Sequence, residues 1–81
     1  MIETIEVTML IKSLTNHETD LKLSDLYELY ALRYYKMKTG LNKIPFPLWD
    51  YIILISSNVK LPFHQLTELI NDWFDNGWCK N

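Results

Sequence analysis

Hydrophobic and polar positions divide the chain into four segments that are separated by polar or proline-containing stretches. The first segment, residues 2–14, has apolar side chains at alternate positions: Ile5, Val7, Met9 and Ile11. This alternation, together with a high content of Ile, Val and Thr, favours a β-strand. A helix is the alternative, since helical spacing also groups four apolar residues of the same segment: Ile2, Ile5, Met9 and Leu14.

The second segment, residues 24–40, has the signals of a complete helix. Ser24 suits the N-cap position, because a hydroxyl accepts a hydrogen bond from an amide of the first turn. Gly40 supplies the left-handed residue with which helices commonly end. Apolar residues cover almost the whole circumference, so this helix is either deeply buried or has an aromatic outer face that meets a partner. The expected inward stripe consists of Leu26, Leu29, Tyr30 and Met37.

Two further helices are predicted in the C-terminal half. Residues 47–58 follow the rigid KIPFP connector. Pro47 can occupy the first helical position and Asn58 can end the helix, so a short buried helix is favoured over a strand. The last segment shows the clearest helical periodicity before Gly77, with inward residues Leu66, Leu69, Ile70, Trp73 and Phe74. The sequence therefore predicts one mainly α-helical domain, residues 1–81, with three to four helices. Its last two helices are expected to pack in a helix-turn-helix-like manner, with room for an N-terminal β-strand or hairpin.

The composition is that of a small globular protein, because 48% of the 81 residues are hydrophobic and 14% are aromatic. A net charge of −2 argues against both a histone-like DNA binder and a strongly acidic mimic. A single cysteine, Cys79, excludes an internal disulfide and fits a reducing compartment. No apolar run approaches the roughly 20 residues of a membrane span, and MIETIEV lacks the basic start of a signal peptide. We expect a cytoplasmic protein with no membrane contact.

Catalysis, metal binding and cofactor binding are not predicted. Neither His17 nor His64 has a second ligand at a metal-binding spacing. Two glycines cannot form a glycine-rich phosphate loop. Cys79 has no basic neighbour other than Lys80 and no histidine partner, so a catalytic thiol is not expected. The acidic positions of the last helix are read as a solvated face: Glu68, Asp72 and Asp75.

Cations alternate with tyrosines in the stretch YALRYYKMKTGLNK, and no acidic residue occurs between Glu28 and Asp50. Cations that neutralise phosphates beside rings that stack on bases are typical of single-stranded nucleic-acid binding. The alternative is that one tyrosine packs in the core, while the cations form a solvated face or meet an acidic protein. The predicted nucleic-acid-binding residues are Arg33, Tyr34, Tyr35, Lys36, Lys38, Lys43 and Lys60.

The stretch NVKLPFHQLTELINDWFDNGW resembles the end of the DnaD/DnaB-type C-terminal domain of low-GC Gram-positive bacteria and their phages. Leu69 and Trp73 stand at the second and third positions of its Tyr-x-x-x-Ile-x-x-x-Trp motif, and Gln65 replaces its tyrosine. The remaining positions of the resemblance are Asn58, Lys60, Phe63, Gly77 and Trp78. It implies a primosome or replication accessory protein that binds single-stranded DNA and bridges to a helicase, primase or polymerase.

The leading expectation is therefore a non-enzymatic DNA replication accessory protein of a phage or mobile element, which binds a replication enzyme and single-stranded DNA. The alternative is a small inhibitor or adaptor that acts on a host enzyme without DNA contact, since Trp and Tyr dominate interface hot spots. A third hypothesis is a homo-oligomer that uses Tyr30, Tyr34 and Trp78. The expected partner-binding residues are Tyr30, Trp73 and Trp78.

Overall fold

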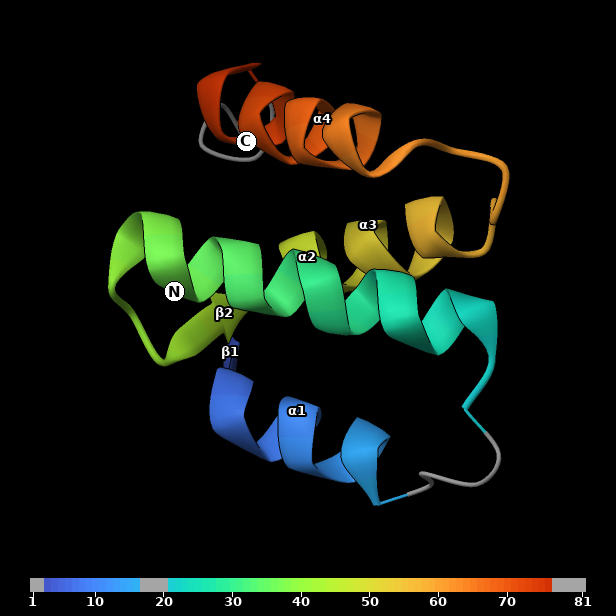
Figure 1. The fold of residues 1–81 in the computed structure, drawn as a ribbon. Coiled ribbons are helices and arrows are strands. Elements are labelled where there is room, and N and C mark those ends of the chain that lie inside the picture. The colour runs from blue at the N-terminus through green and yellow to red at the C-terminus, as the bar shows by residue number, and fades with distance from the viewer. Residues whose placement is uncertain (1–2, 17–20, 77–81) are drawn as a thin grey trace.

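The computed structural model describes residues 3–16 and 21–76, which form four helices and two short strands. In chain order these are β1 (Thr4–Glu6), α1 (Val7–Thr15), α2 (Leu23–Thr39), β2 (Lys43–Pro45), α3 (Phe46–Ser56) and α4 (Phe63–Asn76). Figure 1 shows α2 in front of α3, with α1 below and α4 above, and successive helices run in opposite directions. The prediction of a mainly helical domain with a small N-terminal β element is confirmed.

The N-terminal segment starts as a strand and continues as a helix, so each of the two alternatives for it describes one part. β1 pairs antiparallel with β2, and Ile5 lies opposite Ile44 at the centre of the pairing. The backbone N–H of Phe46 donates to the carbonyl of Glu3 at 2.9 Å and extends this ladder. The KIPFP stretch is thus the partner of the first strand as well as a connector.

α2 begins at Leu23, one residue before the predicted N-cap Ser24, and that N-cap prediction is wrong. The N-cap residue is Lys22, whose backbone N–H donates to the Asp25 carboxylate at 3.0 Å. The carboxylate is a stronger acceptor than a serine hydroxyl, and it also interacts favourably with the positive end of the helix dipole. The C-terminal prediction is confirmed, because Gly40 follows the helix in the left-handed conformation, with φ of 71°.

The last two helices pack against each other and against α2. α3 begins at Phe46, so Pro47 is its second residue rather than its first as predicted, and Ser57 rather than Asn58 caps its C-terminus. The short connection to α4 is held by the Tyr27 hydroxyl, which lies 2.6 Å from the carbonyl oxygen of Leu61 and 2.9 Å from that of Val59. The predicted end of α4 at Gly77 lies outside the described residues.

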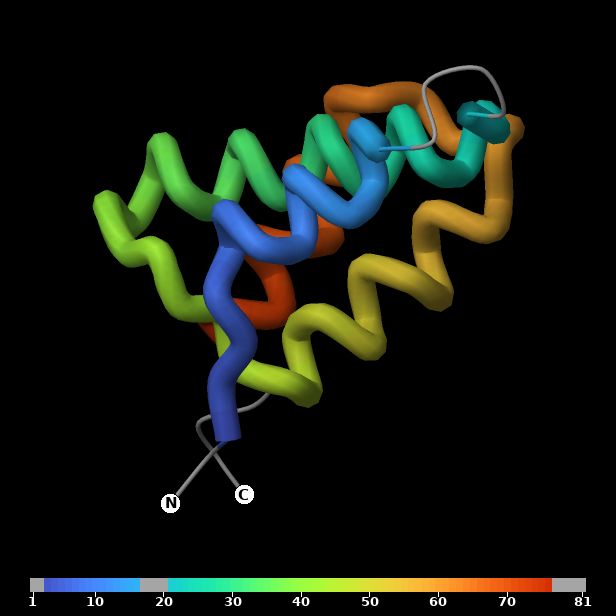
Figure 2. The backbone as a smooth tube through the Cα atoms, turned by 90° about the horizontal axis from the view of Figure 1, so that it is seen from below, coloured from blue at the N-terminus to red at the C-terminus, as the bar shows by residue number. Residues whose placement is uncertain are grey.

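The core lies between the facing sides of α2, α3 and α4 and is closed by α1 and the two strands. Leu66 and Ile70 of α4 are fully buried, and Leu69, Trp73 and Phe74 pack against the core, so the predicted inward side of this helix is confirmed. Figure 2 shows α2 and α3 along opposite edges of the molecule, with their facing sides turned inward. The other fully buried apolar side chains are Val7, Ala31, Leu32, Ile44, Leu48 and Ile52.

Two neighbouring isoleucines of α3 provide a matched test of this core. Ile52 is fully buried, whereas 42% of the Ile53 surface is exposed. We expect Ile52→Ala to lower the free energy of unfolding by roughly 2–5 kcal/mol, because it leaves a cavity. Ile53→Ala should change it by about 1 kcal/mol or less. Urea denaturation followed by circular dichroism measures both, and equal losses would contradict the assignment of the buried side.

Candidate functional site

The side of α2 that points away from the core carries an apolar stripe. Side chains three and four positions apart lie on one face of a helix, and the stripe follows this spacing without interruption. Met37, with 76% of its surface exposed, is its most accessible apolar member, and Arg33 is its only charged member. We call the stripe the α2 outer face; it consists of Leu23, Leu26, Tyr30, Arg33 and Met37.

This arrangement corrects the inward stripe expected from the sequence. Of its four members only Leu29 is buried, while Leu26, Tyr30 and Met37 are exposed. The error has a physical cause, because a helix that is apolar all round offers two stripes of equal periodicity. The side of α2 that is buried includes Tyr27 and Tyr35, whose hydroxyl groups donate hydrogen bonds to backbone carbonyls. The uninterrupted heptad-like spacing of the outer residues was the sequence signal that could have identified them.

An open hollow of about 270 Å³ lies on this side of α2 and is lined by Tyr30, Arg33, Tyr34 and Met37. Phe63, the first residue of α4, extends the same surface, because its ring centroid lies 4.7 Å from that of Tyr30. The ring of Phe63 remains 44% exposed. The apolar surface therefore continues from α2 onto the N-terminus of α4.

The two adjacent tyrosines of the predicted nucleic-acid site are both engaged in the fold. Tyr35 is buried, and its hydroxyl donates to the backbone carbonyl of Lys43 at 2.5 Å. The same burial raises the pKa of this hydroxyl. Tyr34 is half-buried, and its hydroxyl donates to Oδ1 of Asn71 on α4 at 2.9 Å. Stacking of the buried Tyr35 ring on a base would require the helices to separate, whereas Tyr34 also lines the open hollow.

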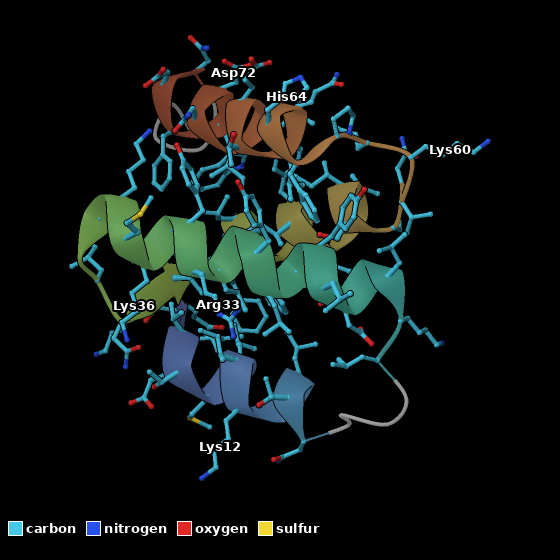
Figure 3. The ribbon with its side chains drawn as sticks, viewed as in Figure 1. Lys12, Arg33, Lys36, Lys60, His64 and Asp72 are labelled. Atoms are coloured by element: carbon cyan, nitrogen blue, oxygen red, sulfur yellow. The ribbon has the colours of Figure 1, made fainter. Side chains whose placement is uncertain are left out.

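The predicted cations do not form one surface. Lys38 is turned toward α4, where its ammonium donates to Asn71 and lies 5.6 Å from the ring centroid of Phe74. Figure 3 shows Lys36 near one end of α2 and Lys60 beyond the other end. The cations that remain exposed on or beside the C-terminal half of α2 without this engagement are Arg33, Lys36 and Lys43.

The three predicted partner-binding residues have different positions. Tyr30 lies on the α2 outer face. Trp73 is half-buried, packs against the core, and meets Phe74 in an edge-to-face arrangement with 5.8 Å between ring centroids. Trp78 lies outside the described residues. Of the two that the structure describes, Tyr30 contributes to the outer face and Trp73 does not.

The structure explains several positions of the family resemblance by packing. The Phe63 ring contacts the rings of Tyr27 and Tyr30 in tilted arrangements, while Leu69 and Trp73 pack against the core. Comparison with protein-family models, with curated proteins and with solved structures finds no match for this chain. The replication role implied by the resemblance stays a prediction.

Within residues 3–16 and 21–76, no three His, Cys, Asp or Glu side chains come together in a way that could hold a metal ion. The helices in this same part of the chain are all too short or too polar to cross a bilayer. The candidate site that the described residues present is the exposed α2 outer face with the hollow beside it.

Glu28 is the last acidic residue before the cationic half of α2, and it is half-buried. Burial, and to a lesser extent the charge of Asp25, raises the pKa of its carboxyl above the ordinary value of 4.5. Because the folded-state pKa is raised, the protonated carboxyl group favours the folded state at a pH below the unfolded-state pKa. This contribution to stability is lost as the pH rises through the folded-state pKa.

We therefore expect Glu28→Gln to raise the Tm at pH 7, with a difference from wild type that shrinks toward zero below about pH 4. Thermal denaturation across this pH range measures the effect. Glu68→Gln, at an exposed position of α4, is the matched control and should show no such trend. Equal Tm values of wild type and Glu28→Gln at pH 7 would contradict the prediction.

Proposed function

We propose that the protein is a non-enzymatic binding protein that docks onto a helix of another protein through the α2 outer face. The observation that carries this proposal is the exposed apolar stripe with a single cation, Arg33, within it. Helices recognise one another through side chains at this spacing, which insert as knobs into the holes of the facing helix. The hollow beside Tyr30 and Met37 is such a hole.

The partner helix is expected to be apolar with one carboxylate opposite Arg33. Docking would remove Arg33 from water among Tyr30 and Met37, and a desolvated cation favours a partner with the opposite charge. Tyr and Arg are also the residue types that contribute most to interface hot spots. A neutral or basic helix of the same shape would bind less well, because the guanidinium would lose water without gaining an acceptor.

We further propose that the partner is a replication enzyme of the helicase, primase or polymerase type. This part rests on the resemblance of residues 58–78 to the DnaD/DnaB-type C-terminal domain. The protein would then be an accessory factor of DNA replication that holds its partner by protein contact. The docking surface itself is argued from α2 and is independent of the partner's identity.

A second candidate function, contact with single-stranded DNA, is favoured by the exposed cations Arg33, Lys36 and Lys43. With Tyr35 buried and the Tyr34 hydroxyl bonded to Asn71, such contact would be mainly electrostatic. Its affinity would be low and would fall steeply with salt. The two functions are compatible, because a protein that docks on a replication enzyme works beside single strands.

The docking proposal is tested by comparing wild type with Met37→Glu and with the control Lys12→Glu, which changes an exposed residue of α1. Each protein is immobilised, exposed to nuclease-treated lysate of its native host, and the captured protein is identified, purified and titrated. We expect the Kd for Met37→Glu to be roughly tenfold or more above that of wild type, because a charge is placed in the apolar contact. Equal affinity of wild type and Met37→Glu would overturn the proposal.

The DNA contact is tested by fluorescence anisotropy of a labelled single strand across a salt series. With about three cations involved, log K should fall against log salt with a slope of roughly −2. Lys36→Ala should weaken binding. Lys60→Ala should not, because Lys60 lies between α3 and α4 (Figure 3), away from Arg33, Lys36 and Lys43. Absence of binding at low salt would remove this candidate and leave docking on a protein as the function.

A further inference from the structure

α3 carries a second exposed stripe, on the side that points away from α2. Its apolar members Phe46, Ile53 and Leu54 have 40%, 42% and 67% of their surfaces exposed. Asp50 lies among them and is the only charged residue within α3, residues 46–56. We call this stripe, completed by the C-cap residue Ser57, the α3 outer face.

The two outer faces have matching residue spacings. Intervals of four, three and four residues separate Leu26, Tyr30, Arg33 and Met37 on α2. Read in the reverse direction, the same intervals separate Ser57, Ile53, Asp50 and Phe46 on α3. An α2 laid antiparallel on the α3 of a second copy would thus bring the residues together in four pairs, from Leu26 with Ser57 to Met37 with Phe46.

The chemistry of this register is complementary. Arg33, the single cation of one face, meets Asp50, the single anion of the other, and an Arg–carboxylate pair forms two parallel charge-assisted hydrogen bonds. Met37 meets the ring of Phe46, a favourable sulfur–aromatic contact. Tyr30 meets Ile53, and the hollow beside Tyr30 and Met37 offers space for a side chain of the second copy.

We propose that the protein assembles with itself head to tail, with the α2 outer face of one copy docked antiparallel on the α3 outer face of the next. The inference rests on the proposed function, because it names a second copy as a partner of the same α2 surface. It commits to Arg33 and Asp50 as the charge pair that sets the register.

The position of the two faces determines how such an assembly grows. α2 and α3 lie along opposite edges of the molecule, so one copy can be engaged on both sides at once (Figure 2). The two helices already run in opposite directions within a copy, and the docked pair does so as well (Figure 1). The α3 helices of successive copies would therefore point in a similar direction, and an interface between unlike faces extends the assembly beyond a dimer.

Sedimentation velocity at increasing protein concentration tests the proposal with variants at exposed positions. Met37→Lys blocks the α2 outer face and Leu54→Lys blocks the α3 outer face. Wild type and the control Lys12→Glu should grow beyond a dimer, whereas each blocked variant should self-associate roughly tenfold or more weakly. An equal mixture of the two blocked variants should give a heterodimer and no larger species, since each keeps one intact face.

A charge exchange tests the register. Arg33→Asp and Asp50→Arg should each weaken assembly by roughly tenfold or more, because like charges then face each other, and the double variant should recover it. A wild type that stays monomeric at millimolar concentration would overturn the inference. Assembly of Asp50→Arg or Leu54→Lys to the same extent as wild type would also overturn it, since α2 would then pair with another α2.

The outcomes separate the inference from the proposed function. A monomeric wild type whose captured host protein is still lost with Met37→Glu overturns self-assembly and leaves docking on another protein intact. Assembly that follows the expected variant pattern, without any host protein sensitive to Met37→Glu, supports the inference and overturns docking on a host partner.

Discussion

The buried side of α2 is the surface on which the other three helices are assembled, and its tyrosines make that burial compatible with hydrogen bonding. An aromatic ring with a hydroxyl offers large apolar area, but the hydroxyl needs a partner when it leaves water. Tyr27 and Tyr35 donate to backbone carbonyls of the α3–α4 connection and of β2. The same two side chains therefore fill the core and position the segments that lead into α3 and α4.

A chain of this length has too little material to cover both sides of a central helix. Small domains bury only about 60% of the surface that their unfolded chains expose. Here α1, α3 and α4 cover one side of α2 and its flanks, and the outward apolar stripes of α2 and α3 are left at opposite edges of the molecule (Figure 2). The candidate site is a consequence of the same packing that makes the fold.

The parts of the fold that the sequence predicts well are the amphipathic elements, which have one apolar side and one polar side. α4 has one apolar and one polar side, so Leu66 and Ile70 could be placed in the core from spacing alone. α2 has no such division, and the choice between its two stripes depends on contacts with α4 and β2. The pairing of Ile5 with Ile44 depends on residues far apart in sequence, which local patterns do not relate.

The positions of the predicted site residues also depend on how the helices pack. The sequence predicts that the cations and tyrosines of α2 form one nucleic-acid-binding set. Their positions depend on helix rotation and on Asn71 of α4, which accepts hydrogen bonds from Tyr34 and Lys38. The sequence predicts Tyr30 both in the inward stripe and among the partner-binding residues, and the structure shows that it is exposed. Arg33 and Asp50 lie on different helices, and only the packing of α2 and α3 shows that both side chains are exposed.

One side of α2 packs in the core and the other is the proposed docking surface, and this limits which substitutions the helix can accept during evolution. Replacements on one side of the helix would disturb packing, and replacements on the other would disturb the association that we propose, so few positions of α2 would then be neutral. Lys12 on α1 and Glu68 on α4 are exposed and outside both stripes, and they are free to vary. Divergent descendants of this protein should therefore be recognisable by the spacing of their central helix long after the remaining sequence has changed.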